Sequence, residues 1–128
     1  MIYLDTSVAL AHLLAEDRLP PESLWDETLV SSRILEYELW NTLHARGLGV
    51  SHGEHARELL HRLALLELSP PVLSRALEPF PVPVRTLDAL HLASVEFLRG
   101  QRETIALASY DARMLEAARR LRVPIHPV

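Results

Sequence analysis

The chain alternates between short apolar runs and longer stretches whose apolar residues have helical spacing. Strand-like runs occupy residues 2–4, 28–32, 65–69 and 104–111. Each run is followed by a stretch in which apolar residues recur three or four positions apart, as on one face of a helix. Short strands that alternate with helices are typical of a parallel sheet covered on both faces. The pattern therefore predicts an α/β fold with a central parallel sheet.

Capping signals and glycines predict where the helices begin and end. The serines at the end of the second strand cap the next helix, which should stop at Gly47 or Gly49. In "SHGE", Ser51 stands three residues before Glu54, and this capping box opens a helix that carries leucines as far as Leu66. Further helices are expected near residues 7–17, 24–25, 70–78, 87–100 (capped by Thr86) and 112–121.

Prolines define two other segments. The stretch "PFPVPVRT" at 79–86 has three prolines in five residues, so it is expected to be an extended connection and not a helix or a central strand. The tail "VPIHPV" at 123–128 is compatible with an edge strand, where proline is tolerated. We therefore expect a sheet of four or five strands.

Composition narrows the possible functions. The 128 residues, 48% of them hydrophobic, predict one globular domain over 1–128. Without cysteine the chain has no disulfide or thiolate metal site, and without lysine it has no lysine base or phosphate-binding lysine. The first apolar stretch is interrupted by Asp5 and His12, so we expect neither a signal peptide nor a membrane span, and a cytoplasmic location. The net charge of −4 argues against nucleic-acid binding by a basic surface alone.

Three of the five aspartates stand after strands or at helix starts: Asp5, Asp88 and Asp111. Asp5 and Asp111 each follow an apolar strand, which delivers them to the sheet edge where open parallel sheets bind ligands. Helix capping is the alternative explanation for each of them, because aspartate is favoured in the first turn.

A glutamate in the second predicted helix joins this set. Glu38 lies on the same helix stripe as Leu35 and Leu39, whereas Glu36 points elsewhere. Two carboxylates about 4 Å apart repel by roughly 4 kcal/mol at an effective dielectric constant of 20, so a converging group needs a counter-charge. An all-oxygen set suits Mg²⁺ or Mn²⁺ better than zinc. His52 and His55 flank the capping box at a solvent-facing helix start, and the three histidines at 52, 55 and 61, without cysteine or an inward carboxylate, are expected to be surface residues.

Four segments, in order and spacing, resemble the PIN-domain family, specifically its VapC-type toxins: "MIYLDTSVAL", "SSRILEYELWNTL", "LDALHLASV" and "LASYDARMLEAARRLRVPI". The resemblance covers nearly the whole chain except residues 51–83. It implies a three-layer α/β/α fold and a Mg²⁺- or Mn²⁺-dependent endoribonuclease held inactive by an antitoxin protein, often as a homodimer. The catalytic and metal-binding acids would be Asp5, Glu38, Asp88 and Asp111.

Other residues have supporting roles in this hypothesis. Thr6 and Ser109 would orient carboxylates or a metal-bound water. For His91 two interpretations stay open: a contact to the site, or a packed, hydrogen-bonded histidine beneath it. The metal would activate a water for in-line attack on an RNA phosphodiester. The arginines proposed near the rim, by proximity in sequence only, are Arg33, Arg85 and Arg113.

Two other functions fit parts of the pattern. An aspartate at a strand end followed by a hydroxyl residue also occurs in Asp-dependent phosphatases and phosphoacceptor domains, although these normally use a lysine that this chain lacks. A catalytically silent PIN-like binding module would keep the fold without the activity.

Overall fold

A parallel sheet forms the centre of the computed structural model, which describes residues 1–128. Its four strands lie in the order β3-β2-β1-β4: β1 (Ile2–Leu4), β2 (Leu29–Ser32), β3 (Leu63–Leu66) and β4 (Ala106–Ala108). In β1, Ile2 lies opposite Leu29 of β2 and Ala106 of β4. All pairs are parallel, so the strands end at one edge of the sheet, as the alternating pattern predicts.

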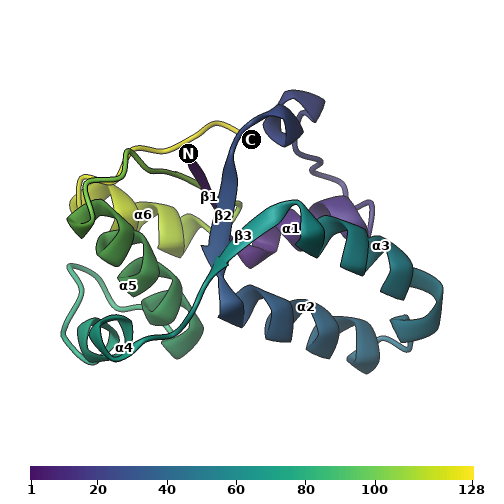
Figure 1. Cartoon of the computed structure of the whole chain (residues 1–128), viewed down its shortest axis with the longest axis horizontal. Helices are drawn as coiled ribbons and strands as arrows, with labels where there is room; N and C mark the ends of the chain where they lie inside the picture. The colour runs from purple at the N-terminus through teal and green to yellow at the C-terminus, as the bar shows by residue number, and fades with distance from the viewer.

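Helices cover both faces of the sheet. In Figure 1, α1, α2 and α3 lie on one side of the strands, and α4, α5 and α6 lie on the other. The helical elements are α1 (Thr6–Leu13), the short 3₁₀ helix η1 (Glu22–Asp26), α2 (Arg33–Ala45), α3 (Gly49–His61), α4 (Pro70–Ala76), α5 (Thr86–Gly100) and α6 (Ala112–Arg120). This is the expected three-layer α/β/α arrangement.

The core consists of two clusters, one on each face of the sheet, and side chains of the central strand β1 alternate between them. Ile2 and Leu4 pack with the apolar faces of α1, α2 and α3, and Tyr3 between them packs with α5 and α6 on the opposite face. Successive side chains of a strand point to opposite faces, so a three-residue strand serves both layers. The segment 79–85 is an extended connection without helix or strand, as its prolines predict.

Two predicted boundaries in the middle of the chain are wrong. Helix α3 begins at Gly49, so Ser51 does not cap it; its hydroxyl donates instead to the carbonyl of Leu48. Leu48, which packs against the core, occupies the N-cap position, and the helix starts two residues before the expected cap. The helix ends at His61, and Leu63 to Leu66 pair with β2 instead of continuing it. Strand pairing has overridden the helical spacing of these leucines.

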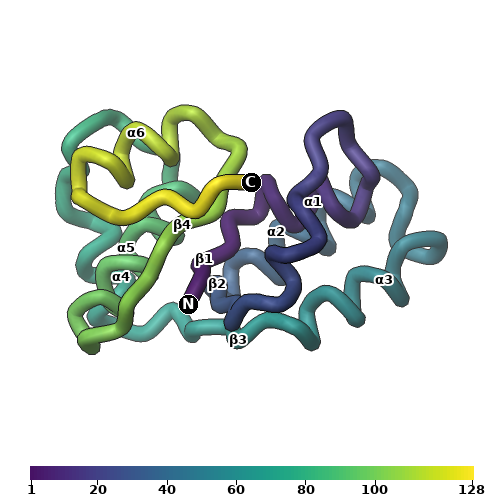
Figure 2. Tube along the Cα trace, turned by 90° about the horizontal axis from the view of Figure 1, so that it is seen from above, coloured from purple at the N-terminus to yellow at the C-terminus, as the bar shows by residue number.

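The start of α5 and the C-terminal tail also differ from the expectation. The helix begins at Thr86 itself, and Arg85 occupies the capping position. The tail runs beside β4 (Figure 2) and forms a single bridge, between Leu107 and Ile125, instead of a strand. Pro124 and Pro127 lack the N–H groups that would extend the pairing. No helix has the length and apolar character needed to cross a membrane.

Candidate active site

The candidate site lies where the order of the strands reverses. The chain passes from β1 outward to β2 and β3, then returns to place β4 on the other side of β1. In open parallel sheets, ligands bind in the crevice beyond the strand ends at such a reversal. Asp5 follows β1 and Ser109 follows β4 directly, so both lie at this point.

Asp5 is buried and held by two hydroxyl groups. Its side-chain Oδ2 accepts hydrogen bonds from Ser7 Oγ at 2.6 Å and from Ser109 Oγ at 2.7 Å. Its backbone N–H donates to the carbonyl of Ala108 at 3.0 Å, which ties the end of β1 to β4. Asp5 occupies the N-cap position of α1, yet its side chain makes no capping hydrogen bond. Helix capping therefore does not explain this aspartate, which is only 5% exposed.

Glu38 of α2 points toward the same region and makes two close contacts. Its Oε1 accepts from Thr6 Oγ1 at 2.8 Å and lies 2.6 Å from His91 Nε2. The Glu38 side chain is 19% exposed, whereas His91 of α5 is fully enclosed. Glu36 instead forms a peripheral ion pair with Arg33 at 3.2 Å. Glu38 thus points inward and Glu36 toward the periphery, as the helix stripe predicted.

His91 satisfies both interpretations that the sequence left open. The ring is packed in the interior, with Nδ1 2.7 Å from the hydroxyl of Tyr3 and Nε2 beside Glu38. It is therefore a buried, hydrogen-bonded histidine that also contacts one of the candidate acids.

Asp111 makes the hydrogen bonds of a helix cap, which was the alternative to a role in metal binding. Its Oδ1 accepts from the backbone N–H of Arg113 at 2.8 Å and of Met114 at 3.2 Å, at the start of α6. Its own backbone N–H donates to Ser109 Oγ, which links it to the residue that holds Asp5. Asp111 thus caps a helix and borders the site at once.

Asp88 lies in the first turn of α5, and its ionisation is influenced by its acidic neighbours. Burial raises the pKa of its carboxyl group, and the negative charges of Asp111 and Asp5 raise it further. The hydrogen bond from the Arg85 backbone N–H, at 3.4 Å, and the nearby His91 act in the opposite direction. Asp111 and Asp5 are therefore close enough to act electrostatically on Asp88.

The structure does not bring the candidate acids together as the ligands of one ion. No group of three or more Asp, Glu, His or Cys side chains is arranged to hold a metal. The chemistry of the donor set nevertheless fits a hard divalent cation, because the acids supply only carboxylate oxygens. A cation would also relieve the repulsion that raises the pKa of Asp88.

The side chains around the acids include residues that the sequence did not single out. Ser7 was missed as a partner of Asp5, although it stands two positions away in the opening motif. Nothing in the sequence indicated that Tyr3 contacts the site, because a tyrosine in an apolar strand looks like any other core residue. Among the proposed rim arginines, Arg33 is bound to Glu67 and Glu36, whereas Arg85 and Arg113 are exposed.

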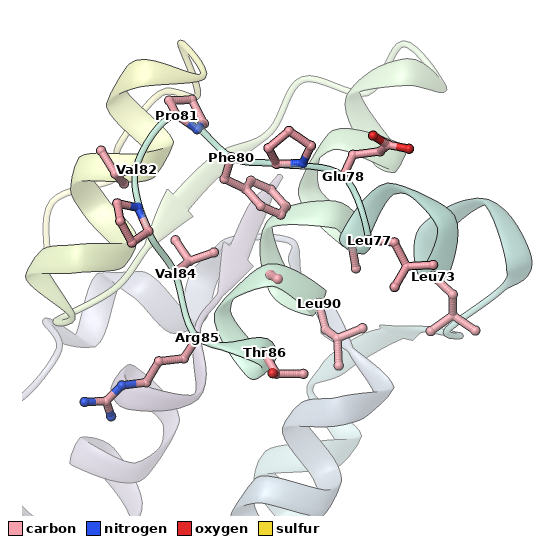
Figure 3. A pocket seen from close by; sticks show the side chains of 14 residues that line it. Leu73, Leu77, Glu78, Phe80, Pro81, Val82, Val84, Arg85, Thr86 and Leu90 are labelled. Atoms are coloured by element: carbon pink, nitrogen blue, oxygen red, sulfur yellow. The ribbon is translucent and has the colours of Figure 1, made fainter.

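A separate apolar groove of about 720 Å³ lies between α4, the segment 79–85 and the start of α5. In Figure 3 the side chains of Leu73, Leu77 and Leu90 line one side of it, and Arg85 extends away from them. Its one acidic lining residue is Glu78, so it offers no second carboxylate for metal or acid-base chemistry. The acids at the sheet edge therefore remain the candidate active site.

Comparison with known proteins identifies the family of the chain. The PIN domain family model matches residues 2–120. Over 126 residues the chain is 33% identical to Ribonuclease VapC47 from Mycobacterium tuberculosis (strain CDC 1551 / Oshkosh), and the match covers 93% of this chain and 90% of that protein. Neither result favours a phosphatase or phosphoacceptor domain. The chain therefore belongs to the PIN-domain family, in its VapC-type branch, as its motifs predicted.

Proposed function

We propose that this protein is a metal-dependent endoribonuclease of VapC type, the toxin of a toxin-antitoxin pair. The observation that carries the proposal is the arrangement at the strand reversal, where Asp5 is fixed by two hydroxyls and the charges of Asp5 and Asp111 both act on Asp88. Similarity to a protein named as a ribonuclease supports the reaction class.

Asp5, Glu38, Asp88 and Asp111 would hold Mg²⁺ or Mn²⁺. The bound ion supplies Lewis acidity and a water of lowered pKa for phosphodiester hydrolysis. Ser7 and Ser109 fix the Asp5 carboxylate in one orientation, because both donate to the same oxygen. Thr6 and His91 do the same for Glu38 through Oε1, which leaves its Oε2 without a hydrogen bond from the protein. Rigid carboxylates of this kind reduce the reorganisation needed when ligand and substrate bind.

The partners proposed are an RNA substrate and a cognate antitoxin, with a second copy of the chain in a homodimer. The positive charge that brings RNA to an acidic pocket would come from the metal and from exposed arginines. Arg85 and Arg113 are better placed for this than Arg33, whose guanidinium donates to Glu67 Oε1 at 2.6 Å and to Glu36 Oε2 at 3.2 Å.

Asp5→Asn tests the proposal. The variant should abolish cleavage of single-stranded RNA in Mn²⁺ or Mg²⁺, because it removes the central negative charge. Its metal-free stability should equal or exceed that of the wild type, because the amide oxygen still accepts hydrogen bonds while the repulsion with Asp88 falls. Cleavage is followed on a labelled RNA, and stability by chemical unfolding in chelator.

The matched control is Asp26→Asn, which removes an exposed aspartate far from the strand reversal and should cleave like the wild type. Normal cleavage by Asp5→Asn would show that the site is assigned to the wrong residues. Incubation of the wild type with acetyl phosphate adds a further check, since a phosphoenzyme on Asp5 would favour phosphotransfer instead.

A further inference from the structure

A continuous chain of side-chain contacts connects the sheet interior to Glu38. The hydroxyl of Tyr3 lies 2.7 Å from His91 Nδ1, and Nε2 of the same ring lies 2.6 Å from Glu38 Oε1. These residues come from β1, α5 and α2, so the chain of contacts joins all three layers of the fold. Tyr3 and His91 are almost wholly buried, whereas Glu38 reaches the surface of the site.

The hydrogen atoms along this chain can be assigned from the acceptors. A carboxylate oxygen only accepts, so the short contact to Glu38 requires the hydrogen on His91 Nε2. In the neutral ring Nδ1 then carries a lone pair and accepts from the Tyr3 hydroxyl. Burial raises the pKa of Tyr3, which keeps its phenol protonated and able to donate. The Tyr3 hydroxyl thus donates to His91 Nδ1, and His91 Nε2–H donates to Glu38 Oε1.

Thr6 is the second donor to the same oxygen. Its Oγ1 donates to Glu38 Oε1 at 2.8 Å and lies 3.2 Å from His91 Nε2. If the ring carried its hydrogen on Nδ1 alone, Nε2 would present a lone pair to the Glu38 oxygen at 2.6 Å and the contact would become repulsive. The orientation of Glu38 therefore depends on which nitrogen of His91 is protonated.

We propose that Tyr3 is a positioning residue for Glu38: its hydroxyl donates to His91 Nδ1 and so reinforces the Nε2–H form of the ring, which holds Oε1 and would leave Oε2 free to bind a metal. The inference rests on the proposed function, since it assigns to Glu38 the role of a metal ligand. Outer contacts of this kind orient ligands, and their loss typically weakens metal binding on the order of 10-fold or more.

The test compares tyrosine-to-phenylalanine variants at the three tyrosines of the chain. Tyr3→Phe should change the His91 ring nitrogen signals in metal-free protein from the Nε2–H pattern toward a mixture of tautomers, measured by ¹⁵N NMR. By calorimetry its Mn²⁺ affinity should fall about 10-fold. In RNA cleavage kcat should fall while KM for RNA stays the same, because Tyr3 does not contact the substrate.

Two controls isolate the hydroxyl that matters. Tyr37→Phe changes the residue beside Glu38 on α2, but Tyr37 is 65% exposed and its hydroxyl makes no hydrogen bond within the chain. Tyr110→Phe removes a buried hydroxyl that has no hydrogen-bond partner. Both should match the wild type in the His91 signals, and Tyr37→Phe should also match it in Mn²⁺ affinity.

The possible results separate this inference from the proposed function. An Nδ1–H ring in the wild type, or equal Mn²⁺ affinity for Tyr3→Phe and Tyr37→Phe, would overturn the inference while leaving nuclease activity intact. A wild type that neither binds Mn²⁺ nor cleaves RNA would overturn the proposed function and, with it, the role given to Glu38. The wild-type NMR measurement needs no variant, so it decides the tautomer even if Tyr3→Phe does not fold.

Discussion

At the scale of single residues, side-chain hydroxyls hold the two innermost acids. Ser7 and Ser109 donate to Asp5, and Thr6 donates to Glu38. Hydrogen bonds to a charged acceptor are stronger than those between neutral groups. Asp88 lacks a hydroxyl donor and accepts only a long bond from a backbone N–H, so its charge is less well compensated.

The raised pKa of Asp88 predicts a pH dependence of stability in metal-free protein. A carboxyl group whose folded pKa lies above its unfolded value of about 4 stabilises the fold fully below that value. This contribution is lost as pH rises through the folded pKa. Relative to Asp88→Asn, the wild type should therefore lose stability as pH increases from about 4 to neutral.

Thermal unfolding in chelator over this pH range measures the effect. The stability of the Asp26→Asn variant should change with pH in the same way as that of the wild type, because Asp26 is exposed. A pH curve for Asp88→Asn that is parallel to that of the wild type as well would contradict the raised pKa of Asp88, which burial and the charges of Asp111 and Asp5 produce.

At the scale of elements, the positions where helices begin determine where the candidate acids lie. Helix α2 begins directly after β2, one residue separates α1 from β1, three residues separate α6 from β4, and α5 begins after the extended segment. The Oγ of Ser32 accepts from the backbone N–H of Ile34 and caps α2, the helix that carries Glu38. The same N-terminal turns that need acceptors for their free N–H groups therefore bring acids to one edge of the sheet.

Two substitutions at Asp111 separate its capping role from a role in metal binding. Asp111→Ala removes the acceptor for two backbone N–H groups and should lower the free energy of unfolding by about 1 kcal/mol. Asp111→Asn keeps a good capping side chain and should change stability by only a few tenths of that amount. Both remove the carboxylate, so both should weaken Mn²⁺ binding.

Denaturant unfolding and calorimetric Mn²⁺ titration read out these two roles independently. If both variants bind Mn²⁺ as the wild type does, Asp111 is a helix cap alone. If Asp111→Ala is as stable as Asp111→Asn, the capping hydrogen bonds do not contribute to the free energy of unfolding.

At the scale of the whole molecule, the site joins layers that are otherwise separate. One core cluster fills the space between the sheet and α1, α2 and α3, and the other fills the space between the sheet and the α5 and α6 side. The acids come from residues 5, 38, 88 and 111, which lie on both sides of the sheet. An ion bound to them would link α2, α5 and the end of β1, and so would stabilise the fold as a whole.

Saturating Mn²⁺ or Mg²⁺ should therefore raise the melting temperature. At a metal concentration 100 times the Kd, binding to the folded state contributes about 2.7 kcal/mol, or roughly 10 °C for a domain of this size. Thermal scans with and without metal, at matched ionic strength, measure the shift. Glu38→Gln should reduce it strongly, and Asp26→Asn should leave it unchanged. An unchanged wild-type melting temperature at saturating metal would count against the metal site.

Much of the fold was predictable because its signals are local. The alternation of strands and helices, the proline-rich connection and the choice of Glu38 over Glu36 follow from periodicity and from residues that restrict the backbone. The start of α3 and the position of β3 were not predictable in this way, since they depend on packing of Leu48 and on pairing with β2. The C-terminal tail failed as a strand because prolines interrupt its hydrogen bonding.

The sequence by itself determined the order of elements and the PIN-domain family, because these depend on short-range patterns and motifs. It also singled out the four candidate acids, whose catalytic role stays a prediction. Only the tertiary structure decided what each acid contacts. Ser109 and Asp5 are 104 positions apart in the chain, and Tyr3 and His91 are 88 apart. Contacts over such separations arise from the parallel pairing of β1 with β4 and the packing of α5 on the sheet, and no local pattern encodes them.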